Sequence, residues 1–90
     1  MTENERTALR DAAQGAVLFH NGLWGAPMGF LWAGSDGSPA GRLPQWEEEA
    51  LALLERRGLV AIRPGVGTRD VPVRATEAGE RLLGEVRAAA

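Results

Sequence analysis

The sequence predicts a small α+β domain with three helices and two β-hairpins. One observation is a segment with apolar residues at helical spacing over 44–57, which opens on a proline and is followed by a glycine. Another is a pair of short β-branched runs, 59–63 and 71–75, separated by a glycine-rich loop. A further apolar pair lies in the first half, over 17–19 and 29–33. The length of 90 residues corresponds to one domain, so residues 1–90 are treated as a single unit.

The N-terminal segment predicts a helix over 3–14. Thr2 and Glu5 have the spacing of a capping box, in which each side chain binds the backbone N–H of the other residue. Small apolar residues then recur on one face, and Gly15 is suited to end the helix. These face residues are Ala8, Leu9, Ala12 and Ala13.

Residues 16–42 permit two interpretations. The run Val17–Phe19 favours a strand, "NG" at 21–22 is a turn signal, and "GFLWA" at 29–33 is a second strand, which together predict an extra hairpin. The alternative is that this segment contains a helix. The glycine-rich run 34–41 predicts a surface loop.

The segment 44–57 gives the strongest helical signal. Pro44 suits the first helical position, acidic residues stand in the first turns, and Gly58 suits the left-handed position that ends a helix. Helical spacing predicts an inward face of Leu43, Trp46, Ala50, Leu53 and Leu54. The outward face then comprises Gln45, Glu48, Glu49, Ala52, Glu55 and Arg56.

The C-terminal third predicts a hairpin followed by a helix. "LVAIR" and "VPVRA" are joined by "PGVGTRD", and Thr76 is a good N-cap for a helix over 77–88. Its apolar contacts are Leu82, Leu83 and Val86, which are also candidates for a dimer contact.

This C-terminal half resembles the second half of a winged helix-turn-helix domain. The helix end "RRGLV", the arginine-bearing hairpin and the opening "T-x-A-G" of the last helix resemble small bacterial regulators of the multiple-antibiotic-resistance type. The resemblance covers 43–87 and implies a winged-helix-like fold, with 44–57 as the recognition helix and the hairpin as the wing. A standard domain of this kind has a further helix within 16–42.

The resemblance implies a DNA-associated regulatory protein whose partner is double-stranded DNA. The candidate contacts to the phosphate backbone are the wing arginines, with two more arginines expected nearby. These residues are Arg63, Arg69, Arg74, Arg57 and Arg42. The net charge of −2 and the acidic outer face of the 44–57 helix oppose the usual docking in the major groove.

The rival hypothesis is a protein-interaction module on the same scaffold, with a protein partner or a second copy as its ligand. It would use either the uncharged aromatic stretch 22–32 or the acidic helix face. The candidate surface residues are Trp24, Met28, Trp32, Glu48 and Glu49. The ordinary alternative is that the aromatic residues complete the core and the glutamates solubilise the helix.

The residue inventory argues against an enzyme. The chain has no cysteine, no lysine and one histidine, so we expect no metal site, no phosphate-binding loop and no cofactor. His20 has only Asp11 and Asn21 as weak candidate partners, and no catalytic set is evident. The charged N-terminus lacks the apolar core of a secretory signal, and 16–32 is too interrupted to span a membrane. We therefore expect a cytoplasmic protein.

Overall fold

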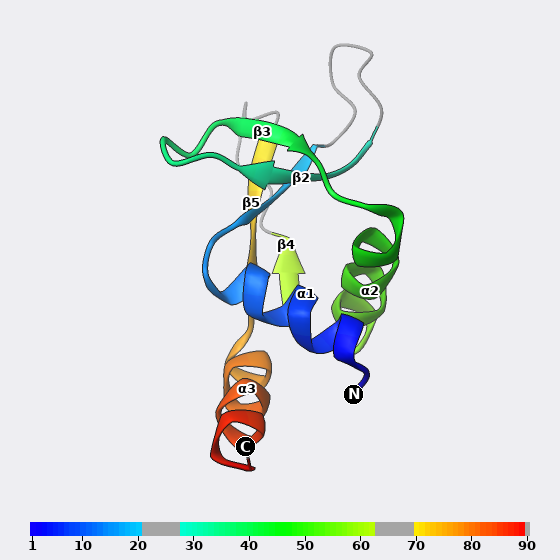
Figure 1. The fold of residues 1–90 in the computed structure, drawn as a ribbon, viewed down its shortest axis with the longest axis vertical. Helices are drawn as coiled ribbons and strands as arrows, with labels where there is room; N and C mark the ends of the chain where they lie inside the picture. The colour runs from blue at the N-terminus through cyan, green and yellow to red at the C-terminus, as the bar shows by residue number, and fades with distance from the viewer. Residues whose placement is uncertain (21–27, 63–69, 90) are drawn as a thin grey trace.

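The computed structural model describes residues 1–20, 28–62 and 70–89, which form an α+β domain with one antiparallel sheet (Figure 1). The elements are α1 (Glu3–Ala13), β1 (Val17–His20), β2 (Gly29–Ala33), β3 (Pro39–Arg42), α2 (Gln45–Arg56), β4 (Val60–Ile62), β5 (Asp70–Ala75) and α3 (Glu77–Ala89). The strand order is β3-β2-β1-β5-β4. The α+β class and the three helices are confirmed. None of the described helices is both long and apolar enough to cross a membrane.

The described part of residues 16–42 is β-structure, so the strand interpretation was right and the helix interpretation was wrong for those residues. β1 pairs with β2 in the register Val17↔Trp32 and Phe19↔Phe30. The predicted loop over 34–41 is corrected, because its second half forms β3 on the edge of the sheet. Asp36 turns the chain into β3 by accepting hydrogen bonds from the backbone and the hydroxyl of Ser38.

One face of the sheet meets the helices and carries the core. Residues directly opposite each other in antiparallel strands point to the same side, so Val17, Phe19, Phe30 and Trp32 share this face. The Phe19 and Phe30 rings meet edge to face, with centroids 5.3 Å apart. α1 and α2 lie side by side against this layer, and α3 extends away from them (Figure 1). The buried core cluster comprises Ala8, Leu9, Ala12, Val17, Phe30, Leu43, Ala50, Leu51, Leu54, Val60, Val73 and Leu83.

The predicted helix ends are largely confirmed. Thr2 and Glu5 form a capping box at α1, and Gly15 and Gly58 adopt the left-handed conformation at φ +76° and +75° after α1 and α2. Pro44 is the N-cap of α2, so the helix begins at Gln45, one residue later than predicted. Thr76 caps α3, since its hydroxyl accepts from the Gly79 N–H at 3.1 Å.

The "T-x-A-G" motif joins the start of α3 to the end of α2. The Thr76 hydroxyl donates to the Gly58 carbonyl at 2.7 Å, and the Thr76 N–H donates to the Leu59 carbonyl at 2.9 Å. Gly79 packs so closely on this strand entry that a Cβ would overlap the Leu59 carbonyl oxygen. The motif therefore serves packing. Of the residues predicted to form a dimer contact, Leu83 is buried in the core of its own chain and Leu82 is half-buried against that core. The side chain of Val86 lies outside the described residues, so the dimer contact stays a prediction.

Candidate functional site: a hollow between α1 and α2

The face that α2 turns to the core differs from the predicted one. Glu47 and Leu51 are buried, whereas Trp46 and Leu53, predicted to face inward, are 40% and 44% exposed. A helix turns about 100° per residue, so Leu51 and Leu53 point in nearly opposite directions and only one can reach the core. Leu51 takes that position. The predicted burial of Leu43, Ala50 and Leu54 is confirmed.

Trp46 and Leu53 border an open hollow between α2 and the N-terminus of α1. Its volume is about 210 Å³, and it is lined by Thr2, Asn4, Glu5, Trp46, Glu49, Ala50 and Leu53. We call these seven residues the Trp46–Leu53 surface. The two large side chains are two helical turns apart, and Ala50 between them leaves room at the floor of the hollow.

The charged residues that line the hollow are acidic. Glu5 accepts a hydrogen bond from Arg57 at 2.7 Å and is tied to Thr2, so its charge is largely compensated. The hydrogen bonds with Thr2, helped by the charge of Arg57, hold the pKa of Glu5 below its usual value. Glu49 is exposed and accepts from the neutral Gln45 amide at 3.0 Å. No base in the described residues forms an ion pair with Glu49, so it gives the hollow a negative rim.

Behind the hollow, a buried acid joins α1 to α2. Glu47 is 1% exposed. Burial, reinforced by a hydrogen bond and charge from the Asp11 carboxyl on α1, raises the pKa of Glu47 to about 8. Glu47 Oε2 has no hydrogen-bond partner among the described residues. Glu47 is sealed from solvent and Asp11 is half-buried, so this pair of carboxyl groups joins the two helices.

A second polar pair, partly buried, lies at the other end of the molecule. His20 on β1 and Asp70 on β5 face each other in the sheet, with Nδ1 and Oδ1 3.0 Å apart. The prediction that Asp11 is a partner of His20 is therefore wrong, and Asn21, the other candidate, lies outside the described residues. His20 Nε2 has no partner in the part of the chain that the structure describes. Across those residues, no three His, Asp or Glu side chains cluster as metal ligands.

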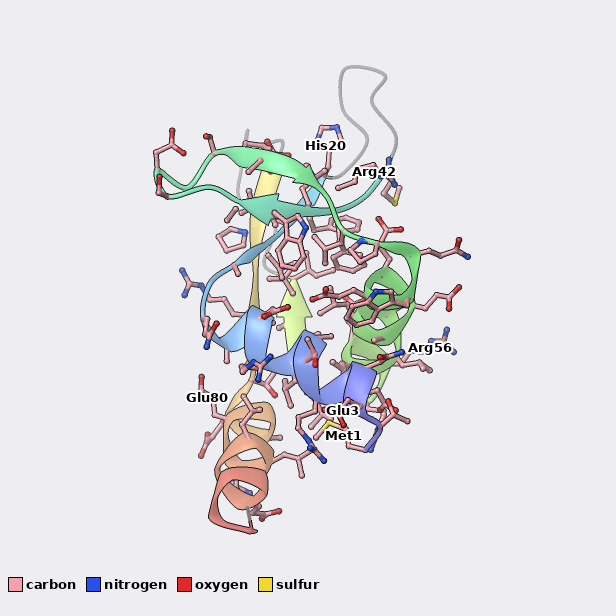
Figure 2. All side chains as sticks on the ribbon, in the orientation of Figure 1. Met1, Glu3, His20, Arg42, Arg56 and Glu80 are labelled. Atoms are coloured by element: carbon pink, nitrogen blue, oxygen red, sulfur yellow. The ribbon has the colours of Figure 1, made fainter. Side chains whose placement is uncertain are left out.

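The predicted arginine patch is only partly visible. Arg63 and Arg69 lie outside the described residues, and Arg74 is exposed on β5. Arg42 lies on β3, three strands away from β5, which corresponds to about 14 Å at the usual strand spacing. Figure 2 shows Arg42 at the β2–β3 end of the molecule.

Arg42 and Arg57 are both engaged with acids. Arg42 contacts Glu48 at 3.4 Å, and Arg57 contacts Glu5 on α1. Arg42 therefore lies apart from Arg74, and its position relative to Arg63 and Arg69 lies outside the described residues. Arg57 directs its charge to α1, so it is not available as an uncompensated phosphate contact.

The predicted partner surface is also divided. Met28 is 65% exposed, as predicted, whereas Trp32 is half-buried against the core and is removed from the candidate surface. Trp24 lies outside the described residues. Glu48 is held by the backbone N–H of Phe30 and by Arg42, so only Glu49 keeps an unpaired charge on this surface. The buried residues of α2, at positions 47, 50, 51 and 54, also have helical spacing, so the sequence contains a signal for this inward face. An acid at the first of these positions disfavours that face on hydrophobicity alone.

No protein-family model, curated protein or solved structure matches the chain.

Proposed function

We propose that the protein is a small interaction module that binds a protein partner through the Trp46–Leu53 surface. The observation that carries this proposal is the exposure of two large apolar side chains on one stripe of α2, beside a hollow, while the neighbouring acid Glu47 is buried. Single exposed apolar residues are ordinary on a protein surface. Two that border a hollow, one of them a tryptophan, have the composition of a binding hot spot.

The charge of α2 supports a protein ligand over a nucleic acid. Its solvent side carries Glu48, Glu49 and Glu55 against Arg56. Phosphates would be repelled by this face, and apolar side chains give nothing to a phosphate backbone. The acidic-face form of the interaction hypothesis is thus favoured, and its apolar component comes from α2 rather than from residues 22–32.

The interaction is tested by site-specific photocrosslinking in cells that express the protein naturally. A benzophenone amino acid at Leu53 is expected to crosslink a partner that the same probe at Met28, an apolar position that is even more exposed, does not. Trp46→Ala should then weaken binding of the purified partner by at least about tenfold. A partner whose affinity is indifferent to both Trp46→Ala and Leu53→Ala would refute the proposal.

DNA association remains the second candidate, and a specific feature favours it. The order α2, hairpin β4–β5, α3 matches what the winged-helix resemblance implies for 43–87, and Arg74 stands exposed on β5. Described residues within 16–42 hold strands where that family has a helix, so contact would rest on the hairpin alone. If a labelled duplex binds, Arg63→Ala and Arg69→Ala should each lower the salt slope by about one.

The duplex titration separates the two candidates. No binding at low salt would leave the interaction module as the proposed function. Tight, salt-sensitive binding that Trp46→Ala leaves unchanged, together with the absence of a crosslinked partner, would replace it with DNA association.

A further inference from the structure

We infer that the occupant of the Trp46–Leu53 surface is a basic amphipathic helix of a different protein, which places one large apolar side chain in the hollow and a lysine or arginine beside Glu49. This inference rests on the interaction function proposed above and specifies the chemistry of the partner.

The size of the hollow favours a side chain over a small-molecule ligand. Pockets for drug-sized ligands and cofactors enclose about 300–1,000 Å³. The hollow beside Trp46 and Leu53, at about 210 Å³, falls below that range. Its volume equals that of roughly seven waters. It therefore suits one large apolar anchor, with Trp46 and Leu53 closing over its sides.

The shape of the surface favours a helix as the element that presents this anchor. Trp46 and Leu53 are seven residues apart on α2, which is about 10.5 Å along the helix axis. A partner helix that lies along α2 keeps its own anchor between them and places residues one turn away next to Glu49. An apolar anchor with a base at i+3 or i+4 is the complementary pattern.

The charge of the rim selects a basic partner and disfavours a second copy of this chain. Glu5 is already compensated by Arg57, whereas Glu49 has no basic partner among the described residues. A two-fold contact would bring the same acidic-rimmed patch of both copies together, so each Glu49 would enter an interface that already holds the acids of the other copy. Opposed carboxylates removed from water cost free energy, whereas a lysine or arginine relieves the charge of Glu49.

A selection experiment tests this inference without a known partner. The probe is a displayed library of random peptides of about 16 residues, selected on the wild-type protein and counter-selected on the Trp46→Ala/Leu53→Ala double variant. Both side chains are exposed, so the variant should keep its fold, which circular dichroism checks. The expected winners carry one large apolar residue with Lys or Arg one helical turn away.

Affinity measurements on the best peptide then assign the contacts. Trp46→Ala should weaken binding about 30-fold, as expected for a hot spot. Glu49→Gln should weaken it by about two- to fivefold, since exposed ion pairs contribute little individually. The matched control Glu55→Gln, an exposed acid on the same helix outside the hollow, should change it by less than about twofold.

Three results would overturn the inference. Winners that depend on Trp46 but are acidic or neutral would keep the interaction function and reject the basic partner. An absence of any Trp46-dependent winner, together with no crosslinked partner, would reject both. A dimer of the protein alone that Trp46→Ala dissociates in sedimentation experiments would show that a second copy occupies the surface.

Discussion

Replacing the buried Glu47 by glutamine should make the protein more stable at alkaline pH and flatten the pH dependence of its stability. Glu47 lies between α1 and α2 with 1% of its surface exposed, and its pKa rises from 4.5 to about 8 through burial and the neighbouring Asp11 carboxyl. Folding therefore favours the protonated acid. Glutamine keeps the shape and a hydrogen-bond donor but carries no charge at any pH.

The magnitude follows from proton linkage. Between pH 4.5 and about 8 the folded chain holds up to one proton more than the unfolded chain at this carboxyl group. The stability from Glu47 is thus fully present below pH 4.5 and is lost as the pH rises through about 8. The slope is at most about 1.4 kcal/mol per pH unit, so the free energy of unfolding should fall by about 2–3 kcal/mol between roughly pH 5.5 and 7.5.

Urea unfolding followed by circular dichroism at about pH 5.5, 6.5, 7.5 and 8.5 measures this slope. Glu5 and Asp36 have lowered pKa values, so their contributions change at acidic pH, below this range. Glu47→Gln should be within about 1 kcal/mol of wild type at the lowest pH and should gain about 3 kcal/mol relative to wild type between the lowest and the highest pH. Glu55→Gln, an exposed control on α2, should keep the wild-type slope. Parallel slopes for wild type and Glu47→Gln would refute the assignment of a buried protonated acid.

Three further changes test the packing by the same unfolding measurement. Gly79→Ala should cost about 1–3 kcal/mol because its methyl group meets a backbone carbonyl, whereas Gly84→Ala in the same helix meets nothing and should gain about 1 kcal/mol; equal effects would contradict the close approach. Thr76→Ala should lower the free energy of unfolding by about 1–2 kcal/mol, and no change would contradict a stabilising N-cap at Thr76. Asp70→Ala should cost about 1–3 kcal/mol by leaving His20 without its described partner, and Asp70→Asn should cost less.

Local chemistry made the helix ends and most strands predictable. The capping box of Thr2 and Glu5, the left-handed glycines Gly15 and Gly58, and the Thr76 cap each depend on residues within a few positions of one another. Such signals are readable because the groups they satisfy belong to the same turn of chain. The segment 39–42 was missed as a strand because proline, glycine and an exposed surface give it no alternation.

Contacts between distant segments could not be predicted in the same way. His20 and Asp70 are 50 residues apart and meet only because β1 lies beside β5 in the sheet. Likewise, the separation of Arg42 from Arg74 follows from the strand order, which brings β2 and β1 between them. No spacing in the sequence encodes the strand order. A patch that groups Arg42 with Arg74 by sequence therefore does not survive in the folded sheet.

The error on α2 bears directly on function. Helical spacing assigns Trp46 and Leu53 to the core and gives Glu47 no place in it, whereas the folded chain buries Glu47 and exposes the other two side chains. This exchange lowers stability twice, since it buries an acid that must stay protonated and leaves two large apolar side chains in water. Local rules that fail together in this way are expected at functional sites. A partner that covers Trp46 and Leu53 would recover the second loss, which is the physical reason for placing the binding function on this face.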